Sequence, residues 1–174
     1  MTRLRSALPR FAEPAIKLGF VAIIAATVVA VGLLIIARLQ SSASDIPQDI
    51  ANYRLLESVT GTRALQMVSA MHQGPLQVTE AWIGYYEQDG MIWSGTTGSS
   101  ESAKAQLESM ASAIGKGGTP FSNIQESNRE GRRIFTVRDS SSIHYFFQSG
   151  TQVIWVTLPR NSGSAFIDAV LRKY

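Results

Sequence analysis

The chain has 174 residues, of which 45% are hydrophobic and 17% charged, and it contains no cysteine. This length fits one domain of ordinary size, and the apolar content excludes a disordered chain. Without cysteine there is no disulfide framework, thiolate nucleophile or cysteine-ligated metal. The net charge of +3 comes from residues 1–44, because residues 45–174 carry eleven Lys/Arg against twelve Asp/Glu. Residues 45–174 have no excess positive charge to attract phosphates, so no nucleic-acid partner is expected.

Residues 18–37 are twenty consecutive residues without a charge, bounded by Lys17 and Arg38. A helix of that length spans about 30 Å, the thickness of the hydrocarbon core of a bilayer. Four Lys/Arg precede the run closely and one follows it, so the positive-inside rule keeps the N-terminus in the cytoplasm. The sequence therefore predicts a single-pass protein of the cell membrane, in contact with the lipid bilayer. Its parts are a basic cytoplasmic segment (1–17), a transmembrane helix (18–38), a linker (39–52) and an extracytoplasmic domain (53–174).

A cleaved signal peptide is the competing interpretation of the apolar run, because small residues at positions 41–43 lie near a possible cleavage site. The hydrophobic region of a signal peptide usually has about 7–15 residues, which favours a retained anchor. The run also carries small residues at helical spacing, which would let a second membrane helix approach closely, although such residues are common in any membrane helix. They are Gly19, Ala22, Ala26 and Ala30.

Local patterns in the first half of the exported part predict a strand, a helix, a hairpin and a second helix. Residues 53–59 alternate weakly, and residues 60–72 have apolar positions at helical spacing. Two β-branched and aromatic runs, 77–87 and 91–97, are joined by Asp89-Gly90, a favoured two-residue turn. Ser99 or Ser100 is a suitable cap for the next helix, which Lys116, Gly117 and Gly118 end.

After Pro120 the hydrophobic period changes to two and predicts four strands joined by short polar turns. The expected strands are residues 121–125, 132–138, 143–148 and 152–158, and a last helix runs to Tyr174. Short turns between successive strands indicate antiparallel pairing. The fold class expected is α+β, with a mainly antiparallel sheet and about three helices.

The chemistry-bearing residues predict no catalytic, metal or cofactor site. The two histidines, His72 and His144, lie in different elements, and the residues around them contain no zinc-binding motif. His144 stands beside three aromatic residues in an expected strand, which favours a hydrogen-bonded sheet residue over a ligand. No serine-hydrolase elbow, P-loop or dinucleotide fingerprint is present. The basic residues at 129–138 have the acids Glu126, Glu130 and Asp139 alongside them, which favours a solvated charged hairpin over a phosphate site.

Aromatic residues are the remaining signal, because they occur on both faces of the expected strands. On residues 143–148 we expect Ile143, Tyr145 and Phe147 to be core and the more polar alternate set to face outward. Exposed aromatic surface is enriched at protein interfaces. The candidate partner surface is His144, Phe146, Gln148 and Trp155.

Two functions follow from these features. The first is a non-enzymatic accessory or scaffold subunit of a membrane complex, whose anchor and exported docking domain contact other membrane-protein subunits. The second is a tethered domain that binds or senses a small molecule. A cofactor-free hydrolase is a third and less favoured interpretation.

Overall fold

A computed structural model describes residues 46–72 and 76–174. The predicted transmembrane helix (18–38), with Gly19, Ala22, Ala26 and Ala30, lies outside this range. In the part of the chain that is described, no helix is both long and apolar enough to cross a bilayer.

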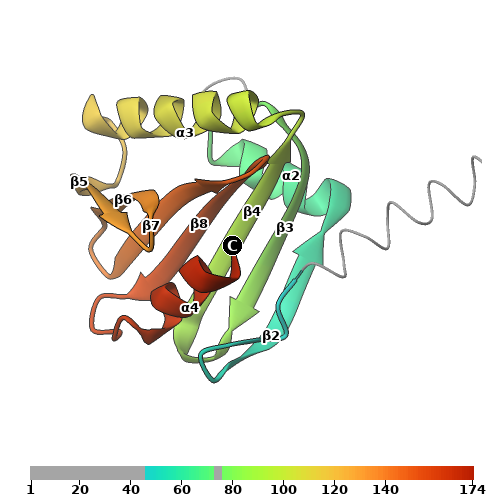
Figure 1. Ribbon diagram of the computed structural model, residues 1–174, viewed down its shortest axis with the longest axis vertical. Helices are drawn as coiled ribbons and strands as arrows, with labels where there is room; N and C mark the ends of the chain where they lie inside the picture. Colours follow the sequence, from blue (N-terminus) through green and yellow to red (C-terminus); the bar gives the residue numbers. More distant parts are fainter. Residues whose placement is uncertain (1–45, 73–75) are drawn as a thin grey trace, which may run out of the picture. The chain divides into compact units, whose positions relative to one another are not determined.

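Eight strands form one sheet in the order β1-β2-β3-β4-β8-β7-β6-β5 (Figure 1). Every pairing is antiparallel, and three α-helices accompany the sheet in the described residues, which confirms the predicted α+β class. The strands are β1 (Asp49–Ile50), β2 (Tyr53–Thr60), β3 (Val78–Tyr86), β4 (Gly90–Thr97), β5 (Ser122–Arg129), β6 (Arg132–Arg138), β7 (Ser142–Ser149) and β8 (Gln152–Pro159). The helices are α2 (Gly61–Ala70), α3 (Ser100–Gly115) and α4 (Ala165–Lys173).

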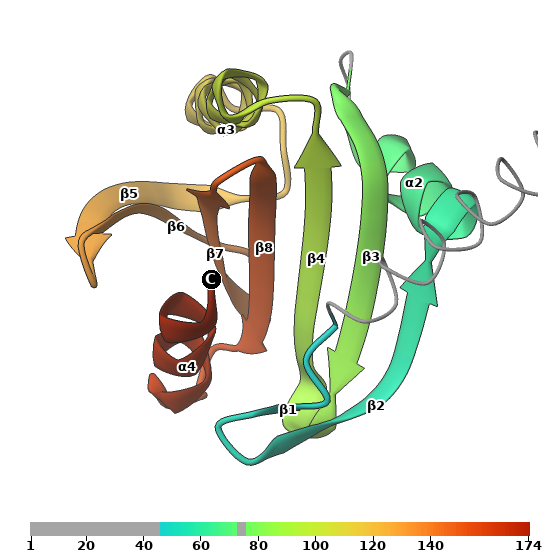
Figure 2. The ribbon, with the colours of Figure 1, turned by 45° about the vertical axis from the view of Figure 1, so that its right-hand side comes forward.

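Helices cover both faces of the sheet. Figure 2 shows α2 and α4 on opposite sides of it. Along β8, Val153 packs in the cluster that contains α3, whereas its neighbour Ile154 packs in the cluster that contains α4. Cross-strand partners then place α2 on the same face as α3, because Ile83 under α2 lies in one register row with Phe146 under α3. These two surfaces are called the α2/α3 face and the α4 face.

The folded domain begins earlier than the predicted boundary at Tyr53. Ile46 and Ile50 are 5% and 3% exposed and belong to the core of the α4 face. The Tyr86 hydroxyl donates a hydrogen bond of 2.9 Å to the carbonyl oxygen of Pro47. The predicted linker (39–52) is therefore part of the folded domain from Ile46 onward.

The β3–β4 hairpin is present, but its turn differs from the predicted Asp89-Gly90 pair. The loop is Glu87–Asp89, and Gln88 and Asp89 take positive φ values of 55° and 58°. Gly90 has an ordinary φ of −72°. A side chain there would place Cβ 3.2 Å from the ring of Phe166 in α4. The close approach of Phe166, rather than the turn, therefore favours glycine at position 90.

Candidate interaction surface

Phe146, predicted to face outward, is completely buried. It lies on the α2/α3 face, where it stacks on Phe135 and Trp155 with ring centroids 5.1 and 4.9 Å apart. It belongs to the cluster that contains Leu107 of α3. The prediction was wrong because it assumed that helices cover one face of the sheet, whereas α3 and α4 cover β7 from opposite sides.

The other members of the predicted partner surface also make contacts inside the domain, and Trp155 is the least buried aromatic residue among them. His144 is 5% exposed. The side-chain amide of Gln148 donates to the carbonyl oxygens of Ser100 and Gly150, which ties β7 to the start of α3. Trp155 remains half-buried. The predicted set therefore does not form one exposed surface.

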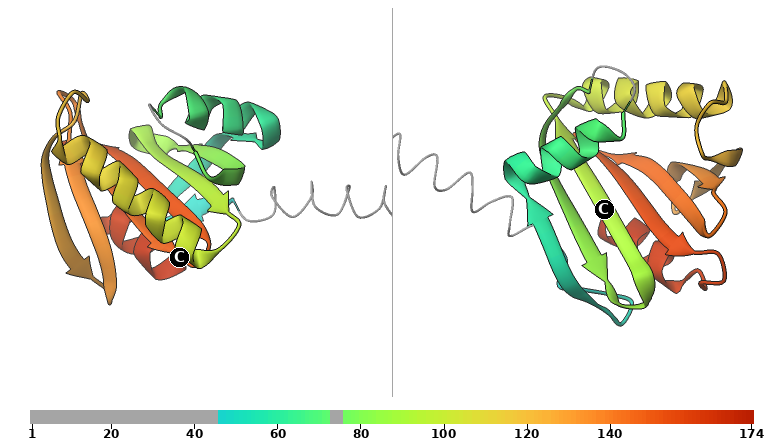
Figure 3. Two further views of the ribbon diagram at one scale, coloured as in Figure 1. Left: turned by 90° about the horizontal axis from the view of Figure 1, so that it is seen from above. Right: turned by 180° about the vertical axis from the view of Figure 1, so that it is seen from behind.

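Figure 3 (right) shows that no helix crosses part of the sheet on the α2/α3 face. A different set of partly buried side chains lies on this face. Two register rows build it from β3, β4 and β8. One row pairs Tyr85 with Met91 and Met91 with Thr157, and the other pairs Trp93 with Trp155. All five side chains are half-buried, while the flanking Ile83 and Phe146 are fully buried. We call the five residues, Tyr85, Met91, Trp93, Trp155 and Thr157, the aromatic patch.

The hydrogen-bond donors of the two indoles are engaged by side chains of the aromatic patch and by His144. The Nε1–H of Trp93 points at the sulfur of Met91. The Nε1–H of Trp155 donates to the hydroxyl of Thr157 at 3.2 Å and to Nδ1 of His144 at 3.3 Å. The indoles therefore offer ring carbon rather than free donors to a partner. Such a surface suits apolar side chains, and methionine adapts to their shapes.

His144 supports the aromatic patch from the side, between the patch and Asp139. Its Nε2 lies 3.1 Å from Oδ2 of Asp139, and its Nδ1 lies 3.0 Å from the hydroxyl of Thr157. Because Nδ1 accepts from Trp155, the network assigns the proton of the neutral ring to Nε2. Burial lowers the pKa of His144 below 6.5, while Asp139 opposes this effect. The prediction of a hydrogen-bonded sheet histidine is confirmed.

Asp139 is held as a carboxylate by the turn between β6 and β7. The backbone N–H groups of Ser141 and Ser142 donate to Oδ1 at 2.8 and 2.6 Å. These bonds and the bond from His144 lower the pKa of Asp139 from 3.8 to about 2. The carboxylate in turn fixes the orientation of the imidazole beside the aromatic patch.

The hydrogen-bonded residues Asp139, His144 and Thr157 are connected like the acid, base and hydroxyl of a catalytic triad, but free N–H donors for an oxyanion are missing beside Thr157. An oxyanion intermediate requires free N–H donors beside the nucleophile. Thr157 lies in the middle of β8, which pairs with β4 on one side and β7 on the other. The backbone donors around Thr157 therefore belong to the sheet, and the three residues form a structural network.

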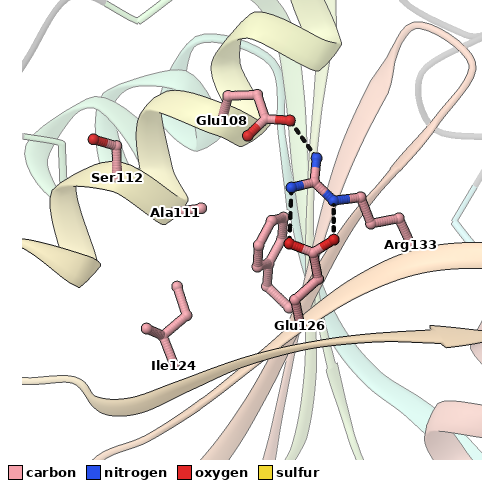
Figure 4. Close-up of a pocket in the computed structure, with 7 residues that line it drawn as sticks. Glu108, Ala111, Ser112, Ile124, Glu126 and Arg133 are labelled. Carbon is pink, nitrogen blue, oxygen red and sulfur yellow. Dashed lines mark hydrogen bonds and ion pairs between the residues drawn. The ribbon is translucent and has the colours of Figure 1, made fainter.

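A shallow cavity of about 340 Å³ lies between α3 and the β5–β6 hairpin (Figure 4). Figure 4 shows the guanidinium of Arg133 between the carboxylates of Glu126 and Glu108, with Ile124 and Ala111 apart from this ion pair. Glu126 accepts two bonds from Arg133, at 2.6 and 2.9 Å. The guanidinium also lies 4.6 Å from the centroid of the Phe135 ring. The charged groups of this cavity pair with one another. These ion pairs connect Arg133 of β6 to Glu108 of α3 and Glu126 of β5.

The arginines at 129–138 do not converge on a phosphate site. Arg129 pairs with Asp168 of α4, and Arg132 lies 5.6 Å from the centroid of the Phe147 ring on the α4 face. Arg133 is on the opposite face, as the strand alternation predicts. Among residues 46–72 and 76–174, no three His, Asp or Glu side chains are grouped so that they could hold a metal ion.

Comparison of the chain with protein-family models, curated proteins and solved structures finds no match in any of the three. The aromatic patch is therefore assigned on geometry alone. Sequence reasoning placed Trp155 in a partner surface but missed Tyr85, Met91 and Trp93. The available signal was the alternation in β3 and β4, where these three residues share a face with Ile83.

Proposed function

We propose that the protein is a membrane-anchored, non-enzymatic accessory subunit whose exported domain docks another protein through the aromatic patch. The observation that carries this proposal is the patch itself. Its five partly buried residues adjoin one another on neighbouring strands of the sheet. A partly exposed apolar surface of this kind, with its indole donors already engaged, supports recognition of another apolar surface.

The membrane placement rests on the sequence. The apolar run at residues 18–37, with four basic residues before it, supports a retained anchor with a cytoplasmic N-terminus and an extracytoplasmic domain. Gly19, Ala22, Ala26 and Ala30 would allow this anchor to pack against a helix of a partner subunit. Anchor and domain would then contact the same complex at two levels.

Recognition of a small molecule is the second candidate function, and the cavity in Figure 4 is its best location. Apolar residues line part of that cavity, but its three charged groups already pair with one another. A ligand would have to displace these ion pairs. The geometry therefore favours the docking function.

Blue-native electrophoresis of the full chain after mild detergent extraction tests the proposed function. We expect a discrete assembly much larger than the 18.9 kDa chain, recovered from membranes washed with alkaline carbonate. Protease added outside spheroplasts should cut the domain once the assembly is dissociated. A lone chain, or release of the protein by carbonate, would contradict the proposal.

A further inference from the structure

A buried titratable side chain, His144, borders the aromatic patch. It is 5% exposed, and its ring contacts those of Phe121 and Trp155, with centroid distances of 5.0 and 5.4 Å. Thr157 is its cross-strand partner in β8. Because Trp155 and Thr157 are two of the five patch residues, a change of charge at His144 acts directly on the aromatic patch.

The neutral His144 ring accepts hydrogen bonds from the aromatic patch through Nδ1. The Nε1 atom of Trp155 lies 3.3 Å from Nδ1 and 3.2 Å from the hydroxyl oxygen of Thr157, which is itself 3.0 Å from Nδ1. A protonated imidazole has two N–H donors and no acceptor. After protonation, the N–H groups of His144 and Trp155 therefore face one another, and of these three groups the hydroxyl alone can still accept.

Asp139 is the charged group that acts on His144, through the contact of 3.1 Å between Oδ2 and Nε2. The side chains that adjoin His144 from β6, from β8 and from the segment before β5 are uncharged: Val137, Trp155, Thr157 and Phe121. Arg160 donates to the main-chain carbonyl oxygen of Asp139, and Arg138 alternates with Val137 onto the opposite face. On α3, Glu108 pairs with Arg133, and the other charged groups at that helix are exposed: Glu101, Lys104 and Lys116.

Resting on the proposed function, we propose that protonation of His144 regulates docking: the aromatic patch binds its partner while the ring is neutral and releases it when the ring is charged. Two effects act in the same direction. A partner that covers Trp155 removes water from the surroundings of His144, and burying a charge further is costly. Loss of Nδ1 as an acceptor also leaves the indole N–H of Trp155 less well satisfied, so the patch suits an apolar surface less.

The charge of His144 changes in acidic solution. Burial lowers the pKa of His144 below its ordinary value of 6.5, and the Asp139 carboxylate opposes this effect. Asp139 itself has a pKa of about 2, so it stays ionised while His144 titrates. A partner that covers the patch favours the neutral ring. By linkage, docking is strongest above pH 6.5 and weakens as the pH falls through the pKa of His144.

Magnetic resonance of the full chain in detergent, labelled with nitrogen-15 tryptophan, tests the switch at Trp155. Trp155→Phe assigns its indole signal among the three tryptophans. Between pH 7.5 and pH 4.5 we expect this N–H signal to shift with a midpoint below pH 6.5. His144→Gln should abolish the shift, and Asp139→Asn should move the midpoint to lower pH, because the charged ring loses its partner carboxylate.

His72→Gln is the matched control and should leave the shift unchanged, because His72 contacts the carbonyl oxygen of Val68 in α2. A Trp155 signal that does not move with pH, or whose shift survives His144→Gln, would overturn the inference. If His144→Gln does not fold, Asp139→Asn decides: an unchanged midpoint would overturn the inference in the same way.

Sedimentation of the detergent-extracted assembly, at pH 7.5 and at one pH unit below the Trp155 midpoint, tests the effect on docking. In acid, the assembled fraction of wild-type and His72→Gln chains should fall about threefold or more, whereas His144→Gln chains should stay assembled. Equal assembly of wild type at both pH values would overturn the regulation, and docking through the patch would stand if Met91→Lys still prevents assembly. A folded Met91→Lys chain that assembles at pH 7.5 would contradict the proposed function itself.

Discussion

Phe146 and Phe147 are consecutive in β7, and both side chains are completely buried, on opposite faces of the sheet. Phe146 packs beneath α3 together with Leu107, and Phe147 packs beneath α4 together with Phe166. The central strands therefore belong to two cores at once. On the α2/α3 face of β3, β4 and β8, the aromatic patch is the set of partly buried side chains that we propose contacts a partner.

The burial of both rings predicts that Phe146→Ala and Phe147→Ala each lower the free energy of unfolding by about 3–5 kcal/mol. Urea denaturation followed by circular dichroism measures both losses. Leu56→Ala is the control, because Leu56 is 63% exposed and its truncation should cost under about 0.5 kcal/mol. A loss below about 1 kcal/mol for Phe146 alone would show that α3 does not cover this part of the sheet in solution.

The buried residues of segment 46–50 predict that the stability of a fragment depends sharply on the residue at which it begins. A fragment of residues 45–174 should fold, because it keeps Ile46 and Ile50. A fragment that starts at Tyr53 loses both buried side chains and the hydrogen bond from Tyr86 to Pro47. Within the longer fragment, Ile50→Ala should cost about 2–5 kcal/mol. Equal thermal stability of the two fragments would show that residues 46–50 contribute nothing to the core.

Gly90 gives a test of the packing between the hairpin and α4. Gly90→Ala places a methyl group 3.2 Å from the buried ring of Phe166, closer than an ordinary van der Waals contact, and should cost about 1–3 kcal/mol. Gly98→Ala is the matched control, since a Cβ at Gly98 meets no atom within 4 Å. Thermal unfolding of both variants measures the difference. Similar melting temperatures would contradict the close approach of Phe166.

The lowered pKa of Asp139 predicts how the stability of the domain depends on pH. Its pKa in the folded protein, about 2, lies below the ordinary value of 3.8. The contribution of the Asp139 carboxylate to the free energy of unfolding is therefore present above pH 3.8 and is lost as the pH falls toward 2. The buried His144, whose pKa is also lowered, adds a loss that begins as the pH falls below 6.5.

Asp139→Asn should lower stability at pH 7 and make its decline below pH 4 less steep. Urea titrations between pH 7 and pH 2.5 measure both effects, and Asp89→Asn in the exposed β3–β4 loop is the control. Parallel pH profiles for wild type and Asp139→Asn would mean that the carboxylate forms no network with Ser141, Ser142 and His144 in solution.

Features encoded in a few neighbouring residues were predictable from the sequence. The β3–β4 hairpin follows from its two β-rich runs. The start of α3 follows from Ser99, whose hydroxyl accepts from the N–H of Ser102. The four-strand meander follows from period-two alternation with short polar turns.

Features that depend on which helix covers which face were not predictable in this way. Strand alternation divides Phe146 and Phe147 between two faces but does not show that both faces are covered. The consecutive aromatic residues at 145–147 were a signal for two-sided burial. Ile46 and Ile50 lie among polar residues, so only the folded structure shows that they enter the core.

The aromatic patch is the central claim, and a pair of methionines tests it most directly. Met91 is in the patch, whereas Met71, at the end of α2, is 56% exposed and outside it. Met91→Lys places a charge in the docking surface, and Met71→Lys adds the same charge elsewhere. Tyr85→Ser is a second patch variant, should Met91→Lys unfold the domain. Circular dichroism of residues 45–174 selects the variants that remain folded.

Blue-native electrophoresis of the full chains then compares each folded variant with wild type. The account predicts one large assembly for wild type and Met71→Lys, and a lone 18.9 kDa chain for Met91→Lys and Tyr85→Ser. A folded Met91→Lys or Tyr85→Ser protein that stays in the full assembly would contradict docking through the aromatic patch.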